Sequence, residues 1–146
     1  NLVFITPNVC NDGHDAPCVD KEPGGLVSAD RFLAAEVPKI LASPAYKADG
    51  MLVITLDEAA ISSAAACCHT PPAPNVAQPG LSGPGGGRIG TLVLSSRTKA
   101  GTTDATPYNH YSLLCSMEDM FGLAHLGFAG APGLACFGKD VYDASP

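Results

Sequence analysis

Basic residues and long apolar runs are both scarce in this sequence. It contains 8 lysines and arginines against 14 aspartates and glutamates, and its formal net charge is −6. The absence of a basic cluster argues against nucleic acid or an anionic membrane as the main partner. No apolar stretch approaches the length that a transmembrane helix needs, so we predict no transmembrane segment.

Two familiar catalytic motifs are also missing. Without a G-x-S-x-G sequence, serine-triad hydrolysis has no support. The glycine-rich stretch 83–88 lacks the Gly-Lys-Ser/Thr ending of a P-loop and precedes a predicted strand instead of a helix. We interpret it as a flexible lead-in to that strand, with Arg88 as a minor candidate for a phosphate contact.

What the sequence does contain is typical of one globular domain. Hydrophobic residues make up 46% of the 146 positions and charged residues only 15%, which excludes a disordered chain. This length suits one domain with a sizeable core. The sequence opens one residue before a predicted strand and shows no signal peptide, so we expect a processed chain or a C-terminal fragment.

Six cysteines are many for a cytosolic protein of this size, and their even number indicates disulfides in a secreted or periplasmic protein. We predict the pair Cys10–Cys18, which brackets an acidic loop. The pairing of the other four is left open: Cys67, Cys68, Cys115 and Cys136. A zinc site at Cys67-Cys68-His69 is the alternative, but these residues are adjacent rather than spaced as C-x2-C.

The order of secondary-structure patterns predicts an α/β protein. Apolar runs predict strands at 2–6, 51–56 and 89–94. A helix is predicted from an N-cap at Ser28 to residue 41, with Pro38 either interrupting it or opening its last turns. The clearest helix, 112–121, has one apolar stripe, and Glu118 and Asp119 are expected on its solvated face. Strand, helix and strand in succession imply a right-handed parallel crossover.

The first of three polar clusters follows the first predicted strand and contains Asn11, Asp12, His14 and Asp15. A carboxylate two residues from an imidazole offers oxygen and nitrogen ligands to a metal, or an acid/base pair. The alternative is a loop of Asx-turns made rigid by a disulfide.

The second cluster, Asp57 and Glu58, ends the second predicted strand. Adjacent residues on an extended strand point to opposite sides, so both can bind one cation only if the strand breaks there. The small residues Ala59 and Ala60 favour such a break. The alternative is an exposed strand end with solvated acids.

The third cluster, 108–112, precedes the clearest helix and contains Asn109 and His110. A helix N-terminus favours anions and a neutral imidazole, which can ligate a metal or hydrogen-bond a phosphate oxygen. A plain helix cap is the alternative. Since ligands of open α/β sheets gather at the carboxyl ends of strands, the three clusters together favour a phosphate ester beside a metal ion. His69 and His125 are interpreted as ordinary structural or surface histidines.

Four segments, in their order along the chain, closely resemble the phosphoesterase family of acid phosphatases and phospholipase C-like enzymes. This family includes phosphatidylinositol-3-phosphatase-like proteins and belongs to the alkaline phosphatase superfamily. The segments are FITPNVCNDGHD, VPKILASPAYKADGMLVITLDEA, GPGGGRIGTLVLS and TPYNHYSLLCSMEDMFGLAHLG. The resemblance covers nearly the whole chain and implies an α/β sandwich with a central, mostly parallel sheet. Residues 1–146 would be the C-terminal part of this one domain.

The resemblance further implies hydrolysis of phosphate esters through a phospho-enzyme beside a divalent metal ion, with Ca, Mg, Mn and Zn all open. It assigns seven residues to the site: Asp57 and Glu58 as metal ligands, His14, His110 and Asp12 as catalytic residues, and Asn11 and Asn109 as substrate-binding residues. The family's early Glu-Asn metal segment and its nucleophile lie upstream of the strand with which this chain begins. We therefore expect the N-terminal part of the same protein as a partner, and no chemical step from this chain alone.

The substrate class within this family stays open between a phosphate monoester, a phospholipid and a phosphoinositide. The alternative to an enzyme is a non-catalytic fragment or a disulfide-rich module that binds a metal or phosphate.

Overall fold

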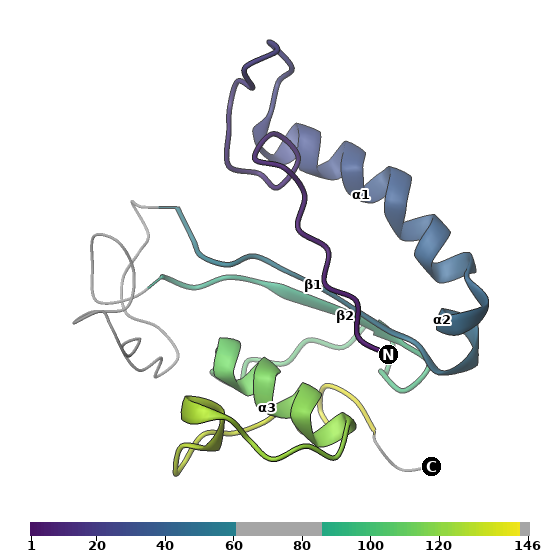
Figure 1. Cartoon of the computed structure of the whole chain (residues 1–146), viewed down its shortest axis with the longest axis vertical. Coiled ribbons are helices and arrows are strands. Elements are labelled where there is room, and N and C mark those ends of the chain that lie inside the picture. Colours follow the sequence, from purple (N-terminus) through teal and green to yellow (C-terminus); the bar gives the residue numbers. More distant parts are fainter. Residues whose placement is uncertain (61–85, 144–146) are drawn as a thin grey trace. The chain divides into compact units, whose positions relative to one another are not determined.

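The computed structural model describes residues 1–60 and 86–143 (Figure 1). The chain divides into two compact units, Asn1–Gly50 and Met51–Pro146. Among the described residues, no helix is long and apolar enough to span a membrane. Fully buried hydrophobic side chains are also few in this part of the chain, so hydrogen bonds and disulfides carry much of the organisation of each unit.

The first unit consists of an irregular segment followed by two helices, α1 (Gly25–Ala42) and α2 (Pro44–Asp49). The N-cap of α1 is Gly24, where the backbone has a φ of 64° and a Cβ atom would collide with the Asp15 carbonyl. Ser28 is buried inside the helix, and its Oγ accepts a hydrogen bond from the Gly24 N–H at 3.0 Å. The prediction of Ser28 as the N-cap is therefore wrong, because glycine alone fits the close approach at residue 24.

Pro38 lies inside α1 and does not end it, although it removes one backbone hydrogen bond. Helix α2 was not predicted from the sequence. It begins at Ser43, whose Oγ accepts a hydrogen bond from the Tyr46 N–H at 3.2 Å, and Pro44 occupies the first turn. The Ser-Pro pair thus starts a new helix directly after α1.

The predicted strand 2–6 is wrong, because these residues form no strand in the structure. Their apolar side chains are exposed, with Val3 at 77% and Phe4 at 84%. A strand requires a hydrogen-bonded partner, and in the described ranges the single sheet has two strands that pair with each other. The predicted parallel crossover from 2–6 to 51–56 is consequently also wrong for these residues.

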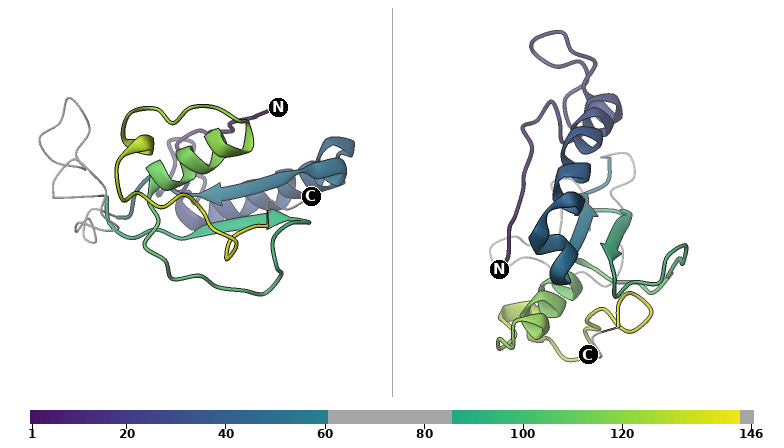
Figure 2. Two further views of the ribbon diagram at one scale, coloured as in Figure 1. Left: turned by 90° about the horizontal axis from the view of Figure 1, so that it is seen from below. Right: turned by 90° about the vertical axis from the view of Figure 1, so that its right-hand side faces the viewer.

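The sheet belongs to the second unit and joins β1 (Met51–Thr55) to β2 (Thr91–Ser95), which lie side by side in Figure 2. The strands are antiparallel, with Met51 opposite Ser95 and Thr55 opposite Thr91. The Oγ1 atoms of Thr55 and Thr91 are 2.8 Å apart and hydrogen bond across the end of the ladder. Both strand predictions are confirmed to within two residues.

Helix α3 (His110–Met120) and a short 3-10 helix, η2 (Gly127–Gly130), follow in the same unit. The side chains that α3 buries are small or polar, and the predicted apolar stripe is only partly covered: the buried residues are Ser112, Cys115, Ser116 and Glu118. A disulfide joins Cys115 to Cys136, and Ser116 Oγ accepts the Phe137 N–H at 2.7 Å. The C-terminal segment is therefore attached to this face of the helix.

Glu118 is 4% exposed, so its predicted position on a solvated face is wrong. Its Oε1 accepts a hydrogen bond from the Leu126 N–H at 3.1 Å. The turn that follows α3 brings this backbone donor over the helix, which helical periodicity alone does not reveal. The prediction holds for Asp119, whose side chain is 52% exposed.

Candidate active site

The first predicted cluster lies in a tight loop, residues 8–15, which we name the acidic loop. Asn8 organises the start of this loop. The Oδ1 atom of Asn8 accepts two hydrogen bonds from Asn11, one from the backbone N–H at 3.2 Å and one from Nδ2 at 2.9 Å. Asp12 Oδ1 accepts the His14 N–H at 2.8 Å, and the Asp15 N–H donates to the Val9 carbonyl at 2.9 Å. The Asn8 and Asp12 side chains thus bind the backbone as in Asx-turns, and the backbone hydrogen bond of Asp15 closes the loop, which has a defined shape of its own.

The imidazole of His14 contacts Asp15 and not Asp12. His14 Nδ1 lies 3.0 Å from Asp15 Oδ1, with the two side chains 77% and 31% exposed. Because an ionised carboxylate only accepts hydrogen bonds, His14 donates through Nδ1. Asp12 holds the backbone of His14, whereas Asp15 orients its ring. The sequence offered Asp15 as part of the cluster but gave it no role.

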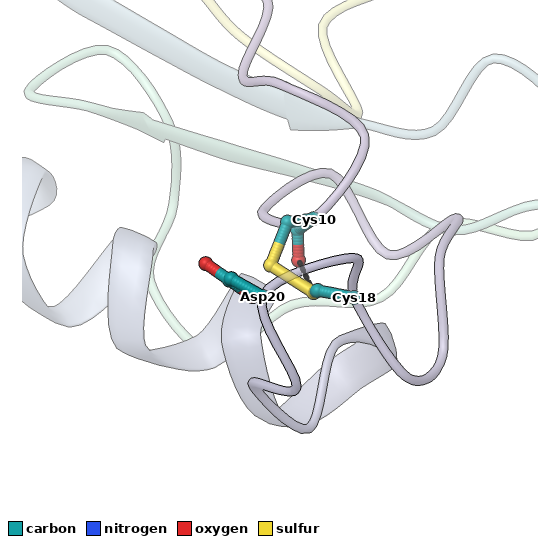
Figure 3. A group of neighbouring side chains, drawn as sticks. All are labelled: Cys10, Cys18 and Asp20. Carbon is teal, nitrogen blue, oxygen red and sulfur yellow. Dashed lines mark hydrogen bonds between the residues drawn. A yellow bond between two sulfur atoms is a disulfide. The ribbon is translucent and has the colours of Figure 1, made fainter.

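The predicted disulfide Cys10–Cys18 is confirmed and closes the acidic loop, with the two Cα atoms 5.4 Å apart. Figure 3 shows Asp20 beside the two sulfurs. A thiolate ligates a metal, but a disulfide sulfur does not, so this group is no metal centre while the bond is intact. A second group contains Asp119, His125 and Cys136, and it is likewise no metal centre while Cys136 is bonded to Cys115. The alternative zinc site at 67–69 lies outside the described residues.

Asp57 and Glu58 come shortly after β1, which ends at Thr55, and the chain bends at Asp57. The extended strand therefore ends before Asp57, which is the condition for both carboxylates to bind one cation. The bend is fixed by two hydrogen bonds, from the Glu58 N–H to Asp57 Oδ1 at 3.0 Å and from the Ala59 N–H to the Gly86 carbonyl at 2.7 Å. Both acidic residues are exposed.

Two carboxylates supply only part of the shell of a hard cation, which takes six or more oxygens. Within the described part of the chain, no group of three or more potential ligands includes Asp57 or Glu58. The residue types thus fit a divalent ion, and further ligands must come from elsewhere.

His110 is the first residue of α3, and its ring reaches the bend at Asp57 that follows β1. Its Nε2 lies 2.7 Å from the carbonyl oxygen of Asp57, a residue 53 positions earlier in the sequence. We name the group of Asp57, Glu58, Asn109 and His110 the β1–α3 junction. Two of the predicted clusters are thereby brought together.

Asn109 is the N-cap of α3. Its Oδ1 accepts hydrogen bonds from the N–H groups of Tyr111 at 2.9 Å and Ser112 at 3.1 Å, and Ser112 Oγ accepts the Asn109 N–H in return. This reciprocal capping fixes the backbone on both sides of His110. The helix-cap alternative for this segment is therefore present in the structure.

Tyr108 adds a contact that the sequence did not indicate. Its hydroxyl donates to Asp140 Oδ2 at 3.2 Å and accepts the Gly138 N–H at 3.0 Å, and its ring meets Phe137 edge-on. Partial burial, together with the Asp140 carboxylate, raises the pKa of Tyr108. The phenol therefore stays protonated and anchors the residue before the cap.

The predicted site residues form two clusters, one in each unit: Asn11, Asp12 and His14 in the acidic loop, and Asp57, Glu58, Asn109 and His110 in the β1–α3 junction.

Comparison with known proteins places the chain in context. The model of the Phosphoesterase family matches residues 1–124. A phosphate-repressible acid phosphatase of Penicillium chrysogenum is 32% identical over 128 residues, which cover 86% of this chain and 24% of that protein. The chain thus spans about a quarter of the length of this relative. No solved structure matches this chain significantly.

Proposed function

Because the chain belongs to the Phosphoesterase family, we propose that it forms part of the active site of a metal-dependent phosphatase that hydrolyses phosphate esters. The observation that carries this proposal is the 2.7 Å hydrogen bond between His110 Nε2 and the Asp57 carbonyl. It joins an imidazole to the backbone that carries two adjacent carboxylates, and these residue types together suit a phosphate group next to a cation. The complete domain would be an alkaline-phosphatase-like sandwich with a mostly parallel sheet.

Each residue of the β1–α3 junction has a role in this proposal. Asp57 and Glu58 would hold a divalent metal ion, which when bound supplies positive charge for the phosphoryl oxygens. His110 would stabilise the phosphoryl group during transfer. Asn109 holds the N-terminus of α3, whose partial positive charge favours a bound anion.

The acidic loop would line the phosphate site, through His14 and Asp12 as catalytic residues and Asn11 as a substrate contact. We assign the nucleophile to the remainder of the protein, because the resemblance implies that the segment carrying it lies upstream of these residues. Two disulfides support an extracellular or periplasmic location.

Replacing the proposed metal ligand tests the function. In the protein that carries this chain, Asp57→Ala is expected to lower turnover of p-nitrophenyl phosphate by about 1000-fold or more, because several kcal/mol of charge stabilisation are lost. Asp30→Ala is the matched control, since Asp30 is an exposed acid on α1. Unchanged turnover in Asp57→Ala would refute the metal assignment.

The alternative function is a non-catalytic module that binds metal or phosphate. To distinguish it from the phosphatase, turnover of p-nitrophenyl phosphate is measured for the 146-residue chain alone and together with the remainder of the protein. We expect turnover only from the two together. Turnover by the chain alone would contradict the external nucleophile. A melting temperature that rises with divalent metal, without turnover in either sample, would favour the binding module.

A further inference from the structure

We propose that Asp119, His125 and Cys136 bind a zinc ion when the disulfide between Cys115 and Cys136 is open, either before the bond has formed or after a dithiol has reduced it. Asp119 lies near the opposite end of α3 from His110. This zinc site is therefore separate from the β1–α3 junction and does not rest on the proposed function.

The three proposed ligands already converge on one point of the second unit. One carboxylate oxygen, one imidazole nitrogen and one sulfur, from Asp119, His125 and Cys136, lie within 4.8 Å of one another. The closest of these contacts joins His125 Nε2 to Asp119 Oδ1 at 2.8 Å. Zinc takes this combination of ligand types and holds its ligand atoms roughly 3.5 Å apart in a tetrahedron. Small movements of the three side chains are therefore enough to enclose the ion.

The disulfide prevents zinc binding in the oxidised protein, because a thiolate ligates a metal and a disulfide sulfur does not. Reduction moves two electrons and two protons from a dithiol to the bond, so that Cys115 and Cys136 become thiols and the dithiol becomes a disulfide. Cys136 then releases its thiol proton as zinc binds. Cys115 is fully buried and its sulfur lies outside the group of three ligands. A water molecule therefore completes the shell of the ion.

The position of Cys136 does not depend on the disulfide. The N–H of the next residue, Phe137, donates to the buried Ser116 Oγ on α3 at 2.7 Å. The Gly138 N–H donates to the Tyr108 hydroxyl at 3.0 Å. These hydrogen bonds hold Cys136 beside α3 when the disulfide opens.

The turn that carries His125 has its own attachment to α3, through Glu118. The Leu123 N–H donates to the Glu118 carbonyl at 2.8 Å, and the Leu126 N–H donates to Glu118 Oε1 at 3.1 Å. The chain is thus bound to the last turn of α3 on both sides of His125. All three proposed ligands keep some exposure to solvent, so a metal ion can reach them.

A second group of potential ligands, Cys10, Cys18 and Asp20, would also gain thiols on reduction. It contains no imidazole, whereas the group at α3 offers a sulfur, a nitrogen and an oxygen. Chemical reduction alone does not distinguish the two groups, because a dithiol can open both disulfides. The test therefore opens one bond by mutation and leaves the other closed.

The first experiment compares two variants that lose the same disulfide, without any reductant. Cys115→Ala leaves the Cys136 thiol beside Asp119 and His125, whereas Cys136→Ala removes the proposed ligand. The protein that carries this chain is titrated with Co²⁺, which gives a sulfur-to-cobalt charge-transfer band only when a thiolate binds it. We expect Cys115→Ala to gain one equivalent of this band, relative to Cys136→Ala and to the oxidised wild type, and to lose it on addition of Zn²⁺. Equal bands in the two variants overturn the inference.

Further substitutions in the Cys115→Ala background separate a zinc site from a lone thiol. His125→Ala and Asp119→Ala should each weaken zinc binding by about 100-fold, because each removes one ligand. Asp20→Ala is the matched control and should leave zinc affinity within about 3-fold. Zinc affinity is measured by displacement of the cobalt band. Affinities that stay equal in all three variants would show that the thiol binds alone, which also overturns the inference.

Thermal unfolding covers the case in which loss of the disulfide destabilises both variants. A metal that binds the folded protein raises its melting temperature. Zinc should therefore raise the melting temperature of Cys115→Ala more than that of Cys136→Ala, whatever other sites the ion occupies in both. If zinc fails to stabilise Cys115→Ala relative to Cys136→Ala, no zinc site forms at α3.

Discussion

The acidic loop and the β1–α3 junction contain similar residue types but reach their geometry by different means. In the acidic loop, close sequence neighbours hold one another, as when Asp12 accepts the N–H of His14, and a disulfide closes the loop over 8 positions. In the junction, the decisive hydrogen bond joins residues 53 positions apart. The loop therefore depends on local chemistry, whereas the junction depends on the fold of its unit.

Local and long-range contacts should also differ in how they respond to mutations elsewhere in the protein. Local turns survive small changes elsewhere, because their partners are always near in the chain. A long-range contact persists only while the elements that carry it stay in place. We therefore expect the junction to respond more strongly than the loop to changes in α3 and its supports.

The largest expected effects on stability concern the two disulfides. Replacing Cys115 and Cys136 by alanine should lower the free energy of unfolding by about 3 kcal/mol, because the bond closes a 21-residue separation and Cys115 is fully buried. The matched change at Cys10 and Cys18, which closes 8 residues, should cost about 2.5 kcal/mol. Urea unfolding followed by circular dichroism measures both. A larger loss of unfolding free energy on removal of Cys10–Cys18 than of Cys115–Cys136 would contradict this prediction.

A smaller effect is expected at Glu118, whose Oε1 accepts the Leu126 N–H in a buried setting. Glu118→Ala leaves that donor unsatisfied and should cost about 2 kcal/mol, whereas Glu118→Gln keeps an acceptor and should stay within about 0.5 kcal/mol. The neighbouring Asp119→Ala is the control, because its contact with His125 is exposed and worth at most about 1 kcal/mol. Equal losses at Glu118 and Asp119 would show that burial of Glu118 contributes nothing.

The same division between local and long-range contacts explains which features the sequence predicts. The acidic loop, the Cys10–Cys18 bond, the strands β1 and β2 and the start of α3 were all indicated by signals within a few residues. The contact of His110 with Asp57 has no such signal, and neither does the Cys115–Cys136 pair. Residues 2–6 have the apolar pattern of a buried strand, but a strand also needs a partner, which a single segment does not specify.

The family resemblance supplies what local patterns cannot, because it groups Asp57, Glu58 and His110 in one site before any contact is known. In the structure the ring of His110 hydrogen bonds to the backbone carbonyl of Asp57, and the assignment of these residues to one site stays a prediction. Placing the acidic loop in the same site remains a prediction.

The smallest effects are expected for Asn109 and Asp12, two side chains that each accept backbone N–H groups, one in the junction and one in the acidic loop. Asn109 Oδ1 accepts two backbone N–H groups as the cap of α3, and Asp12 Oδ1 accepts one in the acidic loop. Asn109→Ala should cost about 1 kcal/mol, and because it frees the backbone at His110 it should also weaken binding of divalent metal, measured by calorimetry. Asp12→Ala should change stability by no more than about 0.5 kcal/mol and leave metal affinity unchanged. Asn109→Asp, which keeps a cap, is the control. If Asp12→Ala lowered metal affinity as much as Asn109→Ala, the acidic loop would have to contribute to binding of the metal ion itself.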